Sequence, residues 1–378
     1  MNLICFSHLR WNFVYQRPQH LLSRFIRDFA TFYIEECIYN DDDEGYYLNV
    51  TEEQVSVIIP HLKGNSKDKI EEDERVEKIL NEVFKDHQIK DYIFWYYTPM
   101  AMGFTQHFEP QLVIYDCMDE LSAFKFAPPA LKILEQELFK KADIVFTGGN
   151  NLYEAKKNQH PNVHAFPSSI DKKHFTKARF NVVEFADQQS IPSPRLGFYG
   201  VIDERFDIDL IREVADSKPN WQFVLIGPVV KINPDTLPRN KNIHYLGAKT
   251  YNELPSYLGG WDIALIPFAI NESTKYISPT KTPEYLAAGK PVISSPITDV
   301  VNPYGINGLV HIVENATEFI NAAEKELSIT DKSAWLEKVD EYLKTISWDI
   351  TWTNMMELIN IELKNKGIFT LKNSKAYV

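Results

Sequence analysis

The chain has 378 residues, and its 40 Lys and Arg against 52 Asp and Glu give a formal net charge of -12 at pH 7. This length exceeds what one hydrophobic core usually organises, so we expect two packed domains. A content of 44% hydrophobic and 13% aromatic residues excludes a disordered or fibrous chain, and the excess of acidic residues excludes a protein that binds nucleic acid by neutralising its phosphates.

The first half of the chain reads as strands alternating with helices. Residues 3–8 form an apolar run that leads into a loop, and residues 18–30 follow with apolar side chains at helical spacing. Residues 68–86 place apolar side chains on one face and charges on the other, as a surface helix does. Strands are predicted at 92–97, 112–116 and 142–147, and a helix at 130–142. This alternation favours a parallel, doubly wound sheet.

The same alternation repeats after a predicted interdomain link at 160–175 and 184–194. Strands are predicted at 195–200, 221–227, 242–247, 261–268 and 290–295. Helices are predicted at 207–216, 251–259, 281–288 and, with a break at Trp348, over 316–365. Because ligands of open α/β sheets bind outside the carboxyl ends of the strands, we expect the site at that edge.

The cysteines and the amino terminus indicate the compartment. Cys5, Cys37 and Cys117 are odd in number and lack CxxC spacing, so neither a disulfide framework nor a zinc cluster is indicated, and a reducing cytosol fits best. The amino terminus lacks the features of a signal peptide, and the longest apolar run, residues 263–270, is too short to cross a bilayer. We expect a cytoplasmic protein, either free or peripheral to the inner face of the membrane.

The segment SPTKTPEYLAAGKPVISSP, residues 278–296, is the most informative. A loop that includes Ser278 and Thr280 enters a short helix whose first turn has free N–H groups and the positive end of the helix dipole, and such a helix start can hold a diphosphate. Lys281 would add a positive charge, and Glu284 could accept hydrogen bonds from sugar hydroxyls. The alternative is an ordinary capped connection in which Lys281 and Glu284 face solvent.

This segment resembles the nucleotide-sugar motif of GT-B glycosyltransferases, since EYLAAGKPVI matches the second half of that motif. WNFVYQRPQHLLSRF and VIYDCMDELSAF are similar to the amino-terminal domain of bacterial surface-polysaccharide transferases, including the teichuronic-acid type. FPSSIDKKHF, GFYGVIDERFDIDLI and SWDITW resemble the family's entry to the linker, its first carboxy-terminal β-loop-α unit and the crossing before its last helix. The resemblance spans nearly the whole chain and implies an α/β fold of two Rossmann-like, doubly wound domains that face a cleft.

The resemblance breaks at one position of the motif. Tyr276 stands eight residues before Glu284, where retaining family 4 enzymes carry their first Glu, and Glu272 lies too far upstream to fill that place. Inverting GT-B enzymes with an S-P-x-K loop are also similar here, and these use a carboxylate base in the amino-terminal domain. Both stereochemical outcomes therefore stay open at this point.

The segment YDCMDE, residues 115–120, offers carboxylates at the end of a predicted strand. A carboxylate that faces the cleft could accept the proton of an acceptor hydroxyl while that oxygen attacks the anomeric carbon. Asp119 is the first candidate and Asp116 the second, because strand side chains alternate and only one of residues 115 and 116 can face the cleft. The alternative role of these carboxylates is to cap the turn or helix that follows.

Arg205 lies in the loop after the first predicted strand of the second domain. The resemblance implies a basic residue against the diphosphate at this place, and a surface ion pair with a neighbouring acid is the alternative. Gly200, at the end of that strand, and Lys231 are further diphosphate candidates. Three residues near strand ends are predicted to flank the nucleotide base, where glycine lets a ligand approach the backbone: Gly227, Leu246 and Gly247.

A polar cluster near the amino terminus is predicted to read an acceptor that carries a phosphate or a carboxylate. Its members are His8, Arg10, Arg17, Gln19 and His20. Helix capping and core packing are the alternatives, and the two histidines lack a third spaced ligand for a metal site. The run 92–104 is expected to be a buried strand and loop, or else an apolar contact for an acceptor or a membrane.

We therefore expect residues 1–180 to form an acceptor-binding domain and residues 190–350 a nucleotide-sugar-binding domain, with a carboxy-terminal helix at 352–378 that packs back on the first. The resemblance implies transfer of a sugar from a nucleoside diphosphate sugar, UDP-linked, to a hydroxyl of a polysaccharide or a lipid-linked oligosaccharide. Neither a cofactor, a metal nor a nucleic acid is expected as a partner. The rival hypotheses are a sugar-nucleotide epimerase or a phosphorylase on the same architecture, and a non-catalytic subunit that binds sugar nucleotides.

Overall fold

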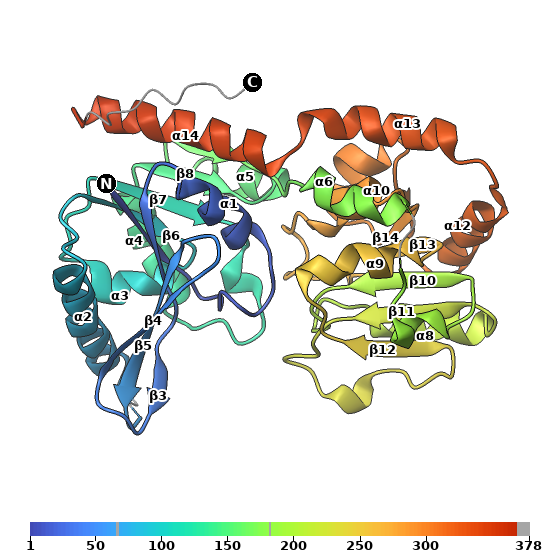
Figure 1. Cartoon of the computed structure of the whole chain (residues 1–378), viewed down its shortest axis with the longest axis horizontal. Coiled ribbons are helices and arrows are strands. Elements are labelled where there is room, and N and C mark those ends of the chain that lie inside the picture. The colour runs from blue at the N-terminus through green and yellow to red at the C-terminus, as the bar shows by residue number, and fades with distance from the viewer. Residues whose placement is uncertain (66–67, 181–182, 369–378) are drawn as a thin grey trace.

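The computed structural model describes residues 1–65, 68–180 and 183–368, so the last part of the helix expected at 352–378, residues 369–378, lies outside the described residues. Two sheets, each covered by helices, stand side by side, the first between residues 2 and 165 and the second between residues 195 and 312. Figure 1 shows the first on the left and the second on the right.

Within the described residues, nine strands form the first sheet, in the order β3-β5-β2-β1-β6-β7-β8-β9, with β4 paired to β5. Neighbouring strands are parallel except β4 and β5, which are antiparallel. The strands are β1 (Asn2–Phe6), β2 (Ala30–Ile34), β3 (Ile38–Asn40), β4 (Gly45–Val50), β5 (Ser56–Lys63), β6 (Tyr92–Tyr96), β7 (Leu112–Cys117), β8 (Ile144–Thr147) and β9 (Val163–Ala165). The α-helices of this half are α1 (Arg17–Phe25), α2 (Lys69–Asp86), α3 (Met102–Thr105), α4 (Leu131–Lys141), α5 (Asn150–Lys156) and α6 (Lys172–Phe175).

The second sheet is parallel throughout its described strands, in the order β12-β11-β10-β13-β14-β15. The strands are β10 (Arg195–Tyr199), β11 (Gln222–Ile226), β12 (Ile243–Gly247), β13 (Ile263–Ile266), β14 (Val292–Ser294) and β15 (His311–Ile312). The α-helices are α7 (Ala186–Gln189), α8 (Ile208–Ser217), α9 (Leu254–Gly259), α10 (Lys281–Ala287), α11 (Thr298–Val300), α12 (Ala316–Ser328), α13 (Ser333–Tyr342) and α14 (Trp348–Asn365).

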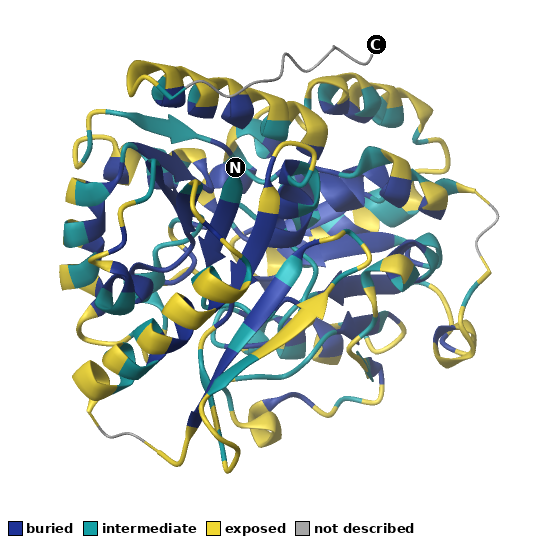
Figure 2. Ribbon diagram, turned by 60° about the vertical axis from the view of Figure 1, so that its left-hand side comes forward, coloured by how far each residue is buried: buried dark blue, intermediate teal, exposed yellow. Residues whose placement is uncertain are grey.

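Burial explains why these segments become strands and helices. Every residue of β7 and of β10 is buried, as expected for parallel strands that are covered on both faces. In α2, by contrast, the buried residues Val76, Ile79, Leu80 and Val83 recur at helical spacing, so the helix covers the sheet with one face only. Figure 2 shows the same division, with buried strands inside and exposed outer faces on the helices.

The last helix, α14, returns to the first domain. Met355, Ile359 and Leu363 belong to the same buried cluster as residues of β1, β6 and β7, and Arg24 of α1 forms an ion pair with Asp349 at 3.2 Å. In Figure 1 this helix runs along the top of the first domain, while α13 runs along the top of the second. The chain therefore crosses between the domains twice.

The fold class predicted from the sequence is confirmed, and the differences lie at element boundaries. The helix expected at 18–30 ends at Phe25, since residues 26–29 turn into β2. Strands β2 to β5, over residues 30–63, are not predicted from the sequence. Part of the link expected at 160–175 forms β9, which pairs with β8 and so extends the first sheet. The exact division at 1–180 and 190–350 stays a prediction.

No helix within the described ranges, 1–65, 68–180 and 183–368, has the length and apolar character that a membrane span requires.

Candidate functional site

A cavity of about 1080 Å³ lies between the carboxyl ends of the strands of the two sheets. On the first-domain side its lining comes chiefly from the loops after β1, β2, β6 and β7 and from the β4–β5 turn. On the second-domain side it comes from the loops after β10, β11 and β12 and from the start of α10. The cavity thus lies at the sheet edge where the strand pattern predicts a site.

The two walls of the cavity differ in charge. On the first-domain wall acidic residues outnumber basic ones, the Asp, Glu, Lys and Arg residues of the lining being Glu36, Glu52, Glu53, Asp119 and Lys125. On the second-domain wall cations outnumber carboxylates, the ionisable lining residues being Arg205, Lys231, Lys249, Lys281, Asp203 and Glu284. An anionic group inside the cavity is therefore more stable against the second domain.

Arg205 is held at the cavity by a neighbouring carboxylate. Its Nε donates to Asp203 Oδ1 over 2.9 Å and its Nη2 donates to Asp203 Oδ2 over 2.7 Å. The guanidinium carbon lies 5.4 Å from the ring centroid of Phe124, which belongs to the first domain, and Lys231 Nζ lies 5.7 Å from the same centroid. The ion pair and the position at the cavity, which the sequence offers as alternatives, therefore occur together.

Lys281 begins α10 and packs its side chain against Gly200. A β-carbon on Gly200 would stand 2.4 Å from Lys281 Cε, and the φ of Gly200, +141°, is one that L side chains rarely adopt. The Lys281 amine also lies 5.7 and 5.6 Å from the ring centroids of Phe198 and Phe268. Burial lowers the pKa of this amine, and the positive charge of Arg205 lowers it further.

Glu284, one turn into α10, is 5% exposed and accepts a short hydrogen bond from the Tyr199 hydroxyl. Burial raises the pKa of its carboxyl, while the Tyr199 hydroxyl and Lys281 act in the opposite direction. The solvent-facing role considered for Glu284 is therefore wrong. This carboxylate belongs to the interior wall of the cavity.

The first turn of α10 offers fewer free amides than its sequence suggests. The N–H of Thr282 donates to Pro279 O over 3.2 Å, and the N–H of Glu284 donates to Thr280 O over 3.3 Å. Pro283 has no N–H to offer. Positive charge on this wall therefore comes chiefly from side chains, those of Arg205, Lys231, Lys249 and Lys281.

Asp119 lies in the loop after β7 and lines the cavity from the first domain. Burial raises the pKa of its carboxyl to about 6, although Arg205, Arg17 and Lys281 each act to lower it. A carboxylate with this pKa is largely ionised at pH 7 and is basic enough to accept a proton from a hydroxyl during reaction.

Asp116, the second candidate base, is fully buried and bound by an arginine. Arg17 donates to it from Nε over 3.1 and 3.0 Å and from Nη2 over 2.8 Å. Arg17 Nη1 also donates to Phe166 O over 2.7 Å. Asp116 is not among the residues that line the cavity, so its geometry fits a structural ion pair and leaves Asp119 as the candidate base.

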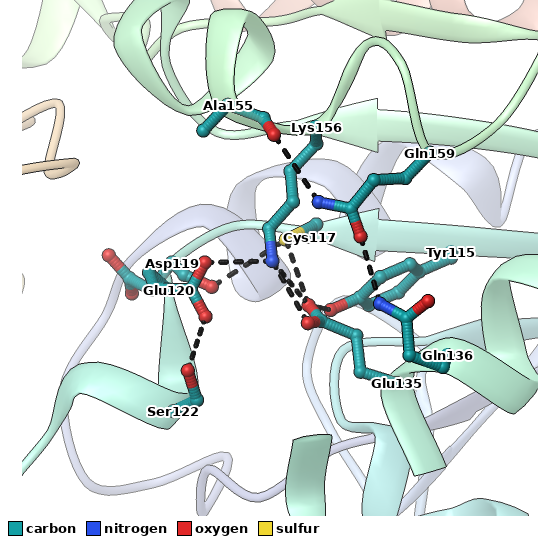
Figure 3. Close-up of polar contacts among 10 residues, drawn as sticks. All are labelled: Tyr115, Cys117, Asp119, Glu120, Ser122, Glu135, Gln136, Ala155, Lys156 and Gln159. Atoms are coloured by element: carbon teal, nitrogen blue, oxygen red, sulfur yellow. Dashed lines mark hydrogen bonds and ion pairs between the residues drawn. The ribbon is translucent and has the colours of Figure 1, made fainter. Parts of the chain in front are cut away.

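A buried lysine supports the Asp119 loop from behind (Figure 3). Lys156 of α5 donates to both carboxylate oxygens of Glu135 over 2.9 Å, and its Nζ lies 2.7 Å from Glu120 Oε2. Ser122 donates to Glu120 Oε1 over 2.7 Å, and the Cys117 thiol donates to Asp119 O over 3.6 Å. The carbonyl of Asp119 and the side chain of its neighbour Glu120 are thus held by fixed partners.

The polar cluster predicted to bind an anionic acceptor does not face the cavity as a group. Arg10 pairs with Glu35 at 2.9 Å, Arg17 pairs with Asp116 and His20 stacks on Trp348 with 4.7 Å between centroids. Gln19 is also used internally, since its side-chain amide donates to Trp11 O over 2.7 Å.

Only His8 of the predicted cluster lines the cavity. Burial, with the positive charge of Lys231 acting in the same direction, lowers the pKa of His8 to about 4. His8 is therefore neutral at pH 7 and provides no charge for a phosphate or a carboxylate. The alternative roles of capping and packing fit Arg10, Arg17, Gln19 and His20 better.

Gly227 lines the cavity at a point where no side chain fits. A β-carbon there would stand 1.9 Å from Gly200 O, and its φ is +142°. Leu246 and Gly247, predicted to flank the same base, are not among the lining residues, although the next residue, Ala248, is.

The loop before α10 divides between the cavity and the domain contact. Thr280 lines the cavity, whereas the carbonyl of Ser278 accepts a short hydrogen bond from Ser168 of the first domain. Tyr276 packs against a hydrophobic cluster of the first domain. Neither Tyr276 nor Glu272 lines the cavity, so this loop places no carboxylate there.

Sequence reasoning missed pairings between residues that are distant in the chain. Arg17 and Asp116 are predicted as separate site residues, but their pairing over 99 positions is not, and Lys156 is missed because it stands in a Lys-Lys pair that is typical of a solvent-facing surface. No local pattern distinguishes such residues from surface charges. In the described ranges, no group of three or more His, Cys, Asp and Glu side chains is arranged to hold a metal ion.

Comparison with known proteins relates this geometry to a family. Residues 193–328 match the family described as "Glycosyl transferases group 1". Over 293 residues, 71% of this chain and 72% of its relative, the sequence is 25% identical to a Bacillus subtilis (strain 168) protein whose name assigns it to teichuronic acid biosynthesis as the glycosyltransferase TuaH. The chain is thus distantly similar to that protein.

Two solved structures share the arrangement of both domains. Sucrose-phosphate synthase from Thermosynechococcus elongatus has a TM-score of 0.72 at 13% identity, covering 96% of this chain and 99% of its own. An E. coli structure, described as trehalose-6-phosphate bound with UDP-2-fluoro glucose, has a TM-score of 0.69 at 11% identity, covering 98% of this chain and 100% of its own. At these identities the likeness shows the fold, which is GT-B.

The buried ion pair predicts that Asp116 contributes more than Asp119 to the stability of the fold. Asp116→Asn should lower the free energy of unfolding by about 3 kcal/mol or more, because it leaves the buried charge of Arg17 without a full counter-charge. Urea denaturation followed by the fluorescence of the first-domain tryptophans measures this change. Asp119→Asn, the matched control in the next loop, should stay within about 1 kcal/mol of the parent. Equal stability of both variants would contradict the assignment.

Proposed function

We propose that this chain, which matches the group 1 glycosyltransferases over residues 193–328 and is distantly similar to TuaH, transfers a sugar from a UDP-linked donor to a hydroxyl of a surface polysaccharide or a lipid-linked oligosaccharide. One observation carries the proposal: the cationic wall with Arg205 and Lys281 faces Asp119 across the cavity. The TuaH relative's assignment to teichuronic acid biosynthesis and the UDP-2-fluoro glucose of the E. coli structure support the choice of acceptor and donor.

The donor takes the second-domain wall. Arg205 and Lys281 hold the diphosphate and stabilise the negative charge that develops on it as the sugar departs. Glu284 accepts hydrogen bonds from hydroxyls of the donor, and the missing side chain of Gly227 lets the nucleotide approach the backbone. Lys231, which like Arg205 lies near the ring of Phe124, adds a third cation to this group.

Asp119 acts as the general base from the opposite wall. The acceptor oxygen forms a bond to the anomeric carbon, its proton passes to the Asp119 carboxylate, and the bond from the anomeric carbon to the diphosphate oxygen breaks with its electron pair. With base and leaving group on opposite walls, the displacement is direct and inverts the anomeric configuration. The position of Tyr276 outside the cavity accords with this choice.

The compartment follows from the thiols and the substrate. The three cysteines are free, which accords with a reducing environment. We therefore place the reaction in the cytoplasm, at or near the inner face of the membrane where a lipid-linked acceptor would be presented.

Replacing the buried cation should weaken donor binding. Lys281→Met should raise the Kd for UDP about tenfold or more, because a charge-assisted contact to the diphosphate is lost. Calorimetric titration with UDP measures the change. Lys275→Met removes an exposed lysine from the same segment and should leave the Kd unchanged. Full UDP affinity in Lys281→Met would remove this residue from the donor site.

Replacing the base should abolish turnover and spare binding. Asp119→Asn should lower kcat by about a hundredfold or more, while UDP binds with nearly its original affinity. In the parent protein kcat/KM should rise with pH through about 6 as Asp119 ionises, and fall again at alkaline pH as Lys281, whose pKa is lowered, loses its proton. Unchanged turnover in Asp119→Asn would end its role as the base.

The reaction should need no divalent cation, because Arg205 and Lys281 supply the charge that offsets the leaving diphosphate. Turnover measured with excess chelator should equal turnover in its absence. Loss of activity that manganese restores would show this electrostatic account to be wrong.

A further inference from the structure

Helix α5 (Asn150–Lys156) contacts the second domain at its first residues and the Asp119 loop at its last residue. We propose that α5 couples the seating of the second domain to the placement of Asp119, with Asp299 and Lys156 as positioning residues at its two ends. The inference rests on the proposed function only in taking Asp119 as the base.

The domain end of α5 is built around Asp299, which follows β14 of the second sheet and is 5% exposed. Its carboxylate accepts hydrogen bonds from Asn150 N over 2.8 Å and from Asn151 N over 3.0 Å. A β-carbon on Gly149 would stand 2.4 Å from Asp299 Oδ2. Asn151 Nδ2 also donates to Lys275 O. A carboxylate of one domain thus caps a helix of the other.

The loop end is equally close-fitting. Gly148 N donates to Cys117 O over 2.9 Å, and a β-carbon on Gly148 would stand 2.2 Å from Met118 O. Lys156, which is 4% exposed, holds Glu120 at 2.7 Å and Glu135 at 2.9 Å. Figure 3 shows Lys156 reaching from α5 to carboxylates on both sides of its amine. Residues 117, 118 and 120, which enclose Asp119, therefore all touch the β8–α5 segment.

Through these two sets of contacts, α5 constrains the position of the Asp119 loop relative to Asp299. Glycines 148 and 149 allow backbone to meet its neighbours without an intervening side chain, so a shift on one side displaces the other. If Lys156 moved away from Glu120 and Glu135, buried charges would be left without a counter-charge, which is costly. Since a general base acts only within hydrogen-bond reach, and a misplacement of about 1 Å can cost a hundredfold in rate, the coupling bears on catalysis.

Hydrogen exchange on the full-length protein tests the coupling without any substrate. Asp299→Ala removes the cap, and Gly149→Ala puts a methyl group where the Asp299 carboxylate lies, without backbone strain because φ at position 149 is -163°. Both variants should speed exchange at residues 117–122, on the far side of α5. Asn315→Ala removes the cap of α12 within the second domain and should leave those residues unchanged. Exchange at 117–122 that matches the parent in both test variants overturns the proposal.

Steady-state kinetics test the contacts at the Lys156 end of α5. Lys156→Met, and the milder Glu120→Gln that keeps the Lys156–Glu135 pair, should lower kcat about ten- to a hundredfold while the Kd for UDP stays within about twofold. Lys157→Met, which removes the exposed neighbour paired with Glu154, should match the parent. A loss of UDP affinity that parallels the loss of kcat would indicate general disruption and overturn a positioning role.

A double-mutant cycle separates α5 from the direct contact that Arg205 makes with Phe124. If Asp299 acts through α5, the fold-reduction in kcat that Asp299→Ala causes should be at least three times smaller in the Lys156→Met background than in the parent. Additive effects overturn the coupling. If no sugar nucleotide supports turnover in the parent, the proposed function fails, and the exchange experiment still decides whether α5 links the two regions.

Discussion

The charge of the cavity depends on two neighbouring cations, Arg205 and Lys281, at the carboxyl edge of the second sheet. Burial and the positive charge of Arg205 lower the pKa of Lys281, which reflects the cost of holding this amine charged beside a second cation. Asp203, Glu284 and Asp119 offset part of it. A diphosphate would offset the rest. The site is thus arranged before any ligand arrives, so binding energy is not consumed in collecting the charges.

In the first domain, by contrast, the buried carboxylates are paired with a cation inside the same domain. Asp116 is bound by Arg17, and Glu135 and Glu120 by Lys156. Asp119 alone among these four lines the cavity. A buried ion pair adds little net stability but is costly to break, so these pairs fix the loops around Asp119 and leave that carboxylate available for chemistry.

Several glycines around the cavity and along α5 allow close contacts that a side chain would block. Glycines at 148, 149, 200 and 227 stand where a β-carbon would lie within 2.4 Å of another atom. Two of them bring Lys281 and the strand ends of the second sheet together, and two bring α5 against Asp299 and the Asp119 loop. Close approach of this kind makes the arrangement of walls and base sensitive to how the domains seat on each other.

The sequence by itself determined the alternation of strands and helices and the sheet edge at which the cavity lies, because hydrophobic periodicity is a local signal. It also singled out Arg205, Lys281, Glu284 and Asp119, all of which line that cavity. The sequence could not decide between Asp119 and Asp116 as the base, and it did not identify Lys156 and Asp299. It also did not show that Arg10 and Arg17 form ion pairs within the first domain or that His20 stacks on Trp348. Those outcomes depend on partners far apart in the chain, and an ionisable side chain carries no local mark of whether folding pairs it, buries it or leaves it facing a cavity.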